Sequence, residues 1–165
     1  MNQVTIRNQL IEWMQSFVEK PHPALGNWPP CPYARQARLT NKMEIVFAER
    51  DFLLTTIKSN LHKLVEKDVI VICFDHTLVS YESLGTLVNS YNKDYLMPLN
   101  YVVLEDHPDA PETLNGVDMN FGYCGLLLLS KLDVLNDASV QLKSKGYYNH
   151  WPKNNLDYVV NWRFE

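Results

Sequence analysis

The sequence lacks the features that mark membrane and secreted proteins. Its apolar runs are short, far below the roughly 20 residues of a membrane-spanning helix. Its first residues include no basic segment followed by an apolar one, so we expect no signal peptide. The three cysteines lie far apart, and no Asn-x-Ser/Thr sequence occurs. A disulfide scaffold is therefore not expected, and these absences predict a soluble, cytoplasmic protein.

An excess of positive charge is also missing. Fifteen Lys and Arg residues stand against 19 Asp and Glu residues, giving a net charge of -4. No overall field would attract nucleic acid or an anionic membrane, so we expect neither as a partner. A small-molecule ligand fits this composition better, and the oligomeric state is left open. At 165 residues, of which 46% are hydrophobic, the chain is long enough to bury the core of one domain covering residues 1–165.

The apolar patterns predict an α/β domain. Runs at 42–49, 69–74 and 101–104 suit buried strands, and amphipathic helices, one capped by Asp51 and one by Ser80, lie between them. Strand–helix–strand units make their strands parallel. We therefore predict a layered α/β domain with a mixed sheet of four or five strands, the first three parallel, and an N-terminal helix over residues 2–20.

The remaining segments are predicted from breakers and periodicity. Residues 21–32 contain five prolines and form a stiff connector. Residues 107–123 are a long irregular loop of the kind that often covers a binding site. A buried strand at 125–130 and a helix at 133–145 follow, and the alternation from residue 157 onward predicts a half-buried edge strand.

Two strands end in acids and a histidine. The second predicted strand runs into Asp75 and His76, and the third into Glu105, Asp106 and His107. Because parallel strands end at one edge of a sheet, where α/β proteins place their ligands, we expect these side chains to be neighbours. A carboxylate that orients an imidazole suits general acid–base work.

The same endings have two other interpretations. His76 and His107 with Glu105 or Asp106 offer nitrogen and oxygen ligands for a divalent metal such as zinc or iron, although no metal-motif spacing supports this. The plainer alternative is that these residues cap strand ends and that Pro108 fixes the following turn.

The segment Cys31-Pro-Tyr33-Ala34 is a second candidate site. Pro32 suits the first position of a short helix, which would make Cys31 its N-cap and lower the pKa of the thiol. The tetrapeptide is similar to the Cys-Pro-Tyr-Cys of glutaredoxins, with Ala34 in place of the second cysteine. A helix and a proline connector precede it, unlike in glutaredoxins, and this favours a structural cysteine.

Arg35 and Arg38 follow on the same short helix. With the free amides of the helix start, and with Tyr33 beside them, they could hold a carboxylate or phosphate. A solvated basic face that pairs with surface acids explains the two arginines equally well.

The Cys31-Pro-Tyr-Ala34 segment, followed later by a strand ending in His107-Pro108, resembles an uncharacterised family of small bacterial proteins. Members carry Cys-Pro-Phe-Ala near the N-terminus and Phe-His-Pro after a central strand. Tyr33 and Asp106 depart from the two phenylalanines of that pattern. Since the family has no established activity, the resemblance implies that Cys31 and His107 are positions of interest and implies no reaction.

Two functions follow as hypotheses. The first is a small enzyme acting on an anionic molecule at the carboxyl edge of the sheet. The catalytic candidates are His107, Asp106, Glu105 and Cys31, and the substrate-binding candidates are Arg35, Arg38, Tyr33, His76 and Asp75. The alternative is a non-catalytic binding or interaction module that uses the 107–123 loop and the aromatic C-terminal tail.

Overall fold

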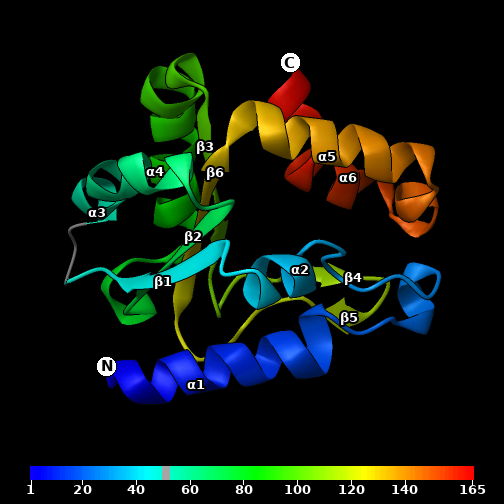
Figure 1. Ribbon diagram of the computed structural model, residues 1–165, viewed down its shortest axis with the longest axis horizontal. Coiled ribbons are helices and arrows are strands. Elements are labelled where there is room, and N and C mark those ends of the chain that lie inside the picture. The colour runs from blue at the N-terminus through cyan, green and yellow to red at the C-terminus, as the bar shows by residue number, and fades with distance from the viewer. Residues whose placement is uncertain (50–52) are drawn as a thin grey trace.

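The centre of the protein is a four-stranded mixed sheet (Figure 1), seen in a computed structural model that describes residues 1–49 and 53–165. Its strands are β1 (Met43–Phe47), β2 (Val69–Phe74), β3 (Tyr101–Asp106) and β6 (Gly125–Lys131), in the order β1-β2-β6-β3. The α/β class and the mixed sheet are confirmed. The predicted cap Asp51 lies outside the described residues.

The prediction that the first three strands are parallel was wrong in one respect. Among the described strands, only β1 and β2 form a parallel pair, because β6 lies between β2 and β3 and pairs antiparallel with both. β3 still runs in the same direction as β1 and β2, so all three end at one edge of the sheet. β6, which separates β2 from β3, contains the apolar run Leu126–Leu129, and this run suits a strand buried on both faces.

Helices cover both faces of this sheet (Figure 1). In chain order, the helical segments are α1 (Gln3–Trp13), η1 (Met14–Val18), η2 (Pro23–Leu25), α2 (Ala34–Leu39), α3 (Leu53–Asn60), η3 (Leu61–Val65), η4 (His76–Leu78), α4 (Tyr81–Tyr91), η5 (Asn92–Leu96), η6 (Met97–Leu99), α5 (Leu132–Ser144), η7 (Tyr147–His150), α6 (Lys153–Val159) and η8 (Asn161–Phe164). Ser80 accepts a hydrogen bond from the amide of Ser83, which confirms it as the cap of α4. Among the helices at residues 1–49 and 53–165, none has the length and apolar character needed to cross a bilayer.

The strand period of two divides the core into two layers. Ile70 and Ile72 of β2 face α3 and α4, in a cluster that includes Ile57 and Leu84. Val71 and Cys73 face the opposite way and join the second cluster, listed here by its α1 and strand members: Ile6, Leu10, Ile45, Val71, Cys73, Leu126. The amphipathic N-terminal helix therefore covers one face, as its sequence pattern predicts.

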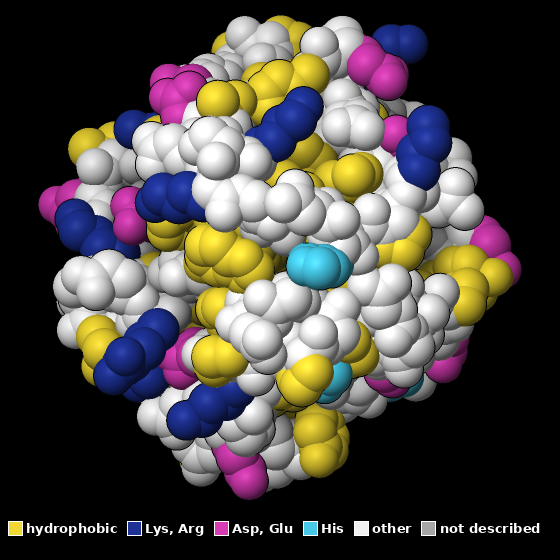
Figure 2. Space-filling view, turned by 90° about the vertical axis from the view of Figure 1, so that its right-hand side faces the viewer, with side chains coloured by type: hydrophobic (Ala, Val, Ile, Leu, Met, Phe, Trp, Pro, Cys, Tyr) yellow, Lys and Arg dark blue, Asp and Glu magenta, His cyan; other side chains and the backbone are white. Residues whose placement is uncertain are grey.

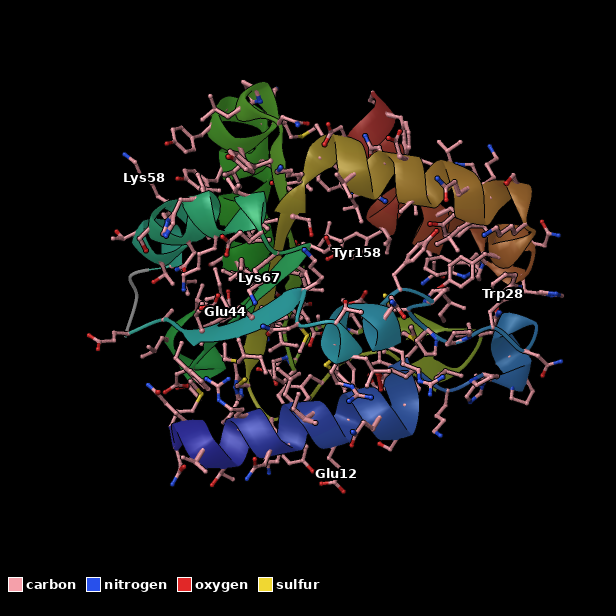
Figure 3. The ribbon with its side chains drawn as sticks, in the orientation of Figure 1. Glu12, Trp28, Glu44, Lys58, Lys67 and Tyr158 are labelled. Carbon is pink, nitrogen blue, oxygen red and sulfur yellow. The ribbon has the colours of Figure 1, made fainter. Side chains whose placement is uncertain are left out.

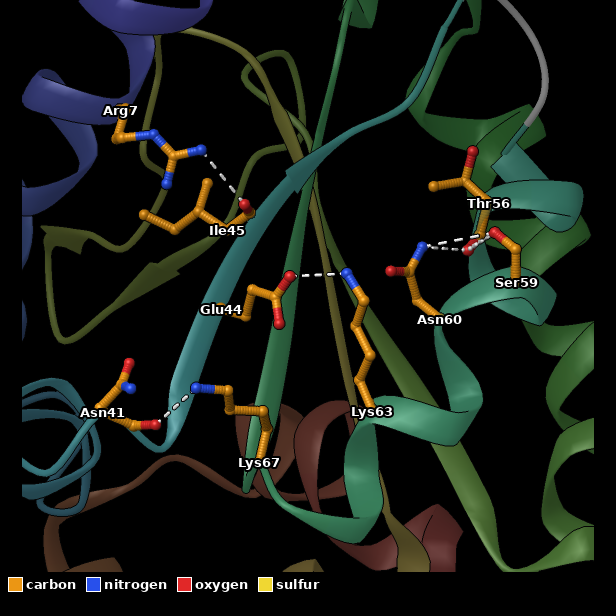
Figure 4. A network of polar contacts seen from close by, with 9 residues as sticks. All are labelled: Arg7, Asn41, Glu44, Ile45, Thr56, Ser59, Asn60, Lys63 and Lys67. Carbon is orange, nitrogen blue, oxygen red and sulfur yellow. Dashed lines mark hydrogen bonds and ion pairs between the residues drawn. The ribbon is translucent and has the colours of Figure 1, made fainter.

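β1 is an edge strand held by basic side chains from the helices beside it (Figure 4). Arg7 of α1 donates to the carbonyl of Ile45 at 3.3 Å, and Lys63 of η3 forms an ion pair with Glu44 at 2.6 Å. A half-exposed pair of this kind adds roughly 0–1 kcal/mol. Its larger effect is to place charge along an edge that could otherwise pair with another chain.

The other edge strand, β3, is protected by one buried amide. Asn92, 1% exposed, donates from Nδ2 to the Val103 carbonyl at 2.8 Å, and its Oδ1 accepts from the Val103 amide at 2.9 Å. The side chain thus makes the two hydrogen bonds that a neighbouring strand would make. It lies where α4 passes into the wider turn of η5, which carries the residue toward the sheet.

Two predicted segments differ from the structure. Residues 107–123 contain a small hairpin, β4 (Thr113–Leu114) with β5 (Val117–Asp118), whose turn has Asn115 and Gly116 at positive φ. The tail predicted as an edge strand is helical in α6 and η8. Its buried residues Val160 and Arg163 recur at helical spacing, and the edge of β3 that a strand would need is already bonded to Asn92.

We predict that Asn92→Ala destabilises the protein by about 2–4 kcal/mol, because it leaves a buried donor and acceptor of Val103 without partners. Urea unfolding followed by circular dichroism measures the difference. Asn89→Ala is the matched control, since Asn89 lies on the exposed face of α4 and its replacement should change stability by less than about 0.5 kcal/mol. Equal effects of the two substitutions would contradict this role for Asn92.

Candidate functional site

A pocket of about 300 Å³ lies at the carboxyl end of β2. The start of α1 forms one wall, the end of β2 with the start of η4 forms another, and the residues before β6 form the floor. The lining residues are Met1, Asn2, Thr5, Ile6, Asp75, His76, Tyr123 and Cys124. The pocket is therefore at the sheet edge predicted from the sequence, and two of the predicted residues, Asp75 and His76, line it.

His76 is the histidine of this pocket. It is partly buried, and its ring meets the His107 ring edge-on with centroids 5.6 Å apart. Within the described parts of the chain, no hydrogen bond reaches its ring nitrogens. The neighbouring Asp75 accepts from the hydroxyl and amide of Thr77 at 2.7 and 3.0 Å, and these hydrogen bonds lower the pKa of the Asp75 carboxyl. Asp75 therefore caps η4 and stays charged at the pocket wall.

His107 is close to His76 but faces the protein backbone. Its side chain is 2% exposed; Nε2 lies 2.8 Å from the Val79 carbonyl and 3.2 Å from that of His76, and Nδ1 accepts from the amide of Asp109 at 3.1 Å. An Nε2–H tautomer satisfies all three contacts. The ring thus connects the end of β3 to the η4 segment and has no nitrogen left for a substrate.

The sequence prediction that the two acid–histidine endings are neighbours therefore holds for the two histidines.

We predict that His107→Ala lowers the free energy of unfolding by about 2–4 kcal/mol through lost packing and unpaired backbone groups. His76→Ala, the matched control, should cost less than about 1 kcal/mol because its ring is partly exposed and not hydrogen-bonded. Urea unfolding compares the two variants. A larger loss in His76→Ala would contradict this division of roles.

Glu105 and Asp106 leave β3 on opposite sides of the sheet. Asp106 is 9% exposed and accepts from the Phe121 amide at 3.0 Å. Glu105 accepts from the hydroxyl of Tyr158, which points from α6 toward the sheet (Figure 3), at 3.0 Å. Neither residue lines the pocket. Both hold the segments that follow β3, so their predicted catalytic role is not supported by their positions.

A third carboxyl group, Glu112, joins them at the base of the hairpin. Burial raises the pKa of Asp106 to about 6 and that of Glu112 to about 7, and the nearby carboxylates add to both shifts. Burial likewise raises the pKa of Glu105. The sequence offered a partial signal for this cluster, since Glu105 and Asp106 are adjacent, but Glu112 was not among the candidates.

These shifts make stability depend on pH. A carboxyl whose folded pKa exceeds its unfolded value, which is about 4, contributes fully below the unfolded pKa and loses that contribution as pH rises through the folded pKa. The window for Asp106 and Glu112 therefore runs from about pH 4 up to pH 6–7. Above it, both groups are charged and partly buried close to each other.

We predict that Glu112→Gln stabilises the protein at pH 8 by on the order of 2 kcal/mol and has little effect near pH 4. Urea unfolding at a series of pH values measures this. Glu12→Gln is the control, because Glu12 is exposed on the outer side of α1 (Figure 3) and should leave the pH profile unchanged. A wild-type stability that rises between pH 5 and 8, with no gain in Glu112→Gln, would contradict the shift.

The Cys31 segment lies at the far end of α1 from the pocket. The Cys31 amide donates to the carbonyl of Val18 at 3.1 Å, whereas the pocket is lined by Met1, Asn2, Thr5 and Ile6 at the start of this segment. At 1.5 Å per residue, the 15 steps from Gln3 to Val18 span roughly 22 Å. Cys31 and His76 therefore cannot act on one small substrate.

The helix start that would activate the Cys31 thiol does not form at this residue. The N-cap of α2 is Tyr33, not Cys31, so the helix begins later than predicted. Amides of Tyr33 and Ala34 bond the thiol and favour its ionisation, but burial among packed neighbours outweighs them and raises the pKa of Cys31. The predicted lowering was wrong because desolvation exceeds the effect of two amides. Although Cys31 is exposed as a residue, its thiol is not activated.

The basic residues of α2 are divided. Arg38 forms a bidentate ion pair with Glu19, at 2.9 Å for the shortest contact, and the Glu19 side chain is only 4% exposed. Arg38 therefore links α2 to the end of η1 through this ion pair. Arg35 and Tyr33 are exposed. Basic, acidic and apolar side chains are interspersed on the face shown in Figure 2.

Comparisons with known proteins leave the site to be interpreted from its geometry alone. No family model, no curated protein and no solved structure matches the chain. The resemblance to small proteins with Cys-Pro-Phe-Ala and Phe-His-Pro segments stays a prediction. Over residues 1–49 and 53–165, no three His, Cys, Asp or Glu side chains are grouped as metal ligands, so the predicted zinc or iron site has no geometric support.

Sequence reasoning identified two of the eight lining residues and missed the other six. Thr5, Ile6, Tyr123 and Cys124 are contributed by segments that carry no motif. Tyr123 is 58% exposed and Cys124 is 1% exposed, so the pocket has an aromatic at its rim and a thiol at its floor. The only signal was indirect: a strand start following a long loop is a common place for ligand contacts.

Proposed function

We propose that this protein is a small-molecule binding domain whose ligand occupies the pocket between α1 and η4. The observation that carries the proposal is the position of His76. It is a polar group without a described hydrogen-bond partner, fixed by the His107 ring at 5.6 Å, in a cavity of about 300 Å³. Concave sites at the carboxyl edge of an α/β sheet, with few well-placed polar groups, are typical of ligand pockets.

The lining defines the class of ligand. Ile6, Cys124 and Tyr123 offer apolar and aromatic surface, and His76 together with the positive end of the α1 dipole favours an anionic group. The Asp75 carboxylate is held by Thr77, which directs it to its own turn. A flat apolar body with one carboxylate, as in a small aromatic acid, suits this combination.

The enzyme hypothesis needs a different central residue. Both nitrogens of His107 bond backbone groups. Cys31, Arg35 and Arg38 lie in and before α2, far from the pocket, next to the end of η1. Proton transfer in the pocket would therefore fall to His76. The enzyme hypothesis therefore stays a prediction in which His76 is the acid–base residue and the substrate is the same class of anionic molecule.

The interaction-module hypothesis is weakened by contacts within the protein. Asn115 at the hairpin turn donates to the carbonyls of Ala24 and His150 at 2.9 and 2.7 Å, and Asn155 of α6 donates to the Thr113 carbonyl at 3.0 Å. The 107–123 segment and the C-terminal tail are thus bonded to each other. Within the tail, Tyr147, Tyr148 and Trp151 pack against one another.

Binding of benzoate, a minimal aromatic acid, tests the proposal. We predict that titration shifts the amide resonances of Thr5, His76 and Tyr123 in ¹H–¹⁵N spectra, with millimolar affinity as expected for a fragment. Thr5→Trp, which fills the pocket, should weaken binding at least about tenfold. Val4→Trp is the matched control, because Val4 is 70% exposed on the outer face of the same turn.

Equal affinities of the two tryptophan variants would contradict the pocket as the binding site. Shifts confined to residues 31–38 would instead indicate the basic helix α2. His76→Ala separates two contributions: a loss of benzoate affinity without a loss of stability assigns His76 to the ligand, and unchanged affinity removes it from the site.

A further inference from the structure

Two thiols meet beneath the floor of the pocket. Cys73 is in the middle of the sheet on β2, opposite Leu126 of β6. Cys124 lies two residues before Leu126 and joins the same core cluster on the α1 face. Both side chains are buried in this cluster, and Cys73 is near enough to Cys124 to affect the pKa of its thiol. Their exposed fractions are 0% and 1%.

We propose that Cys73 and Cys124 form a two-coordinate site for a soft monovalent cation of the cuprous class. Thiolates are the ligands that soft metal ions prefer. Zinc generally requires four ligands, and the described residues supply no third metal-ligating side chain at this place. A linear, two-thiolate site needs none.

The diagonal placement of the two cysteines favours a metal over a disulfide. Residues related as Cys73 and Cys124 are, i and j−2 across an antiparallel pair, have Cα atoms about 7–8 Å apart. A disulfide requires Cα atoms within about 6.8 Å. Two metal–sulfur bonds of about 2.3 Å in line separate the sulfurs by about 4.6 Å, which lets the strands keep their register.

Binding exchanges protons for the metal. A metal ion binds cysteine as the thiolate, so binding displaces the protons that the thiols carry. One cuprous ion replaces both protons: two S–H bonds break, two copper–sulfur bonds form, and two protons pass to the buffer, leaving a complex of charge −1. No oxidation state changes. The affinity must therefore rise with pH.

The pocket provides the route to the thiols. Cys124 is the residue of the pair that lines it, and Cys73 lies behind Cys124 in the core. The metal site thus uses the entrance that the aromatic-acid proposal uses but does not depend on that ligand. His76, at the same opening, does not bond either thiol in the described structure and is not required as a ligand.

Anaerobic titration with Cu(I), in competition with bathocuproine disulfonate, tests the inference. We predict one Cu(I) per chain, visible as a mass increase in native mass spectrometry, with release of two protons. Cys73→Ser and Cys124→Ser should each weaken binding by about two orders of magnitude or more. Cys31→Ser is the matched control and should bind as the wild type does, because Cys31 lies at the far end of α1.

Copper K-edge absorption of the wild-type complex tests the site without any variant, in case a serine disrupts the core. Two sulfur neighbours in a linear arrangement are expected. Nitrogen or oxygen neighbours, or wild-type affinity in Cys124→Ser, would overturn the inference, as would a loss of 2 Da on peroxide treatment with no copper bound. Benzoate binding to the same samples is separate: its failure with copper binding intact contradicts only the proposed function.

Discussion

The backbone hydrogen bonds of β6 to β2 on one side and to β3 on the other hold the molecule together. Without β6, the third strand would have no partner in the sheet, because β2 and β3 do not touch through a ladder. Gly125 at its start is required for this fit. A Cβ there would lie 2.1 Å from the Phe74 ring. The Phe74 ring therefore packs directly on the backbone of Gly125 and leaves no room for a side chain.

The position of β6 also explains why the two acid–histidine endings play different parts. The extra strand separates the ends of β2 and β3, and His107 crosses that distance to bond the His76 and Val79 carbonyls. These contacts use Nε2, and Nδ1 accepts from the amide of Asp109. His76 packs edge-on against the His107 ring, and its own nitrogens have no described partner. The histidine with a structural role and the histidine available to a ligand are therefore direct neighbours.

Local patterns were sufficient for the elements but not for their arrangement. The bounds of β2 follow from its apolar run, and Ser80 is recognisable as a cap because its side chain bonds an amide three residues on. That β6 inserts between β2 and β3 depends on contacts across the chain, which periodicity does not contain. The tail shows the same limit: its short alternation suited a strand, but the i, i+3 burial of Val160 and Arg163 arises only after packing.

The candidate site is where polar groups remain incompletely compensated. Several buried polar side chains are matched within the protein: Asn92 bonds both groups of Val103, and Arg38 pairs with Glu19. Asn120 Oδ1 and Trp151 Nε1 are buried without a partner among the described residues. At the carboxyl edge, His76 lacks a described hydrogen-bond partner, Cys73 and Cys124 are buried in one cluster, and burial raises the pKa of Glu105 and Asp106 at the end of β3. The incompletely paired polar groups at this edge can interact with a molecule that is not part of the chain.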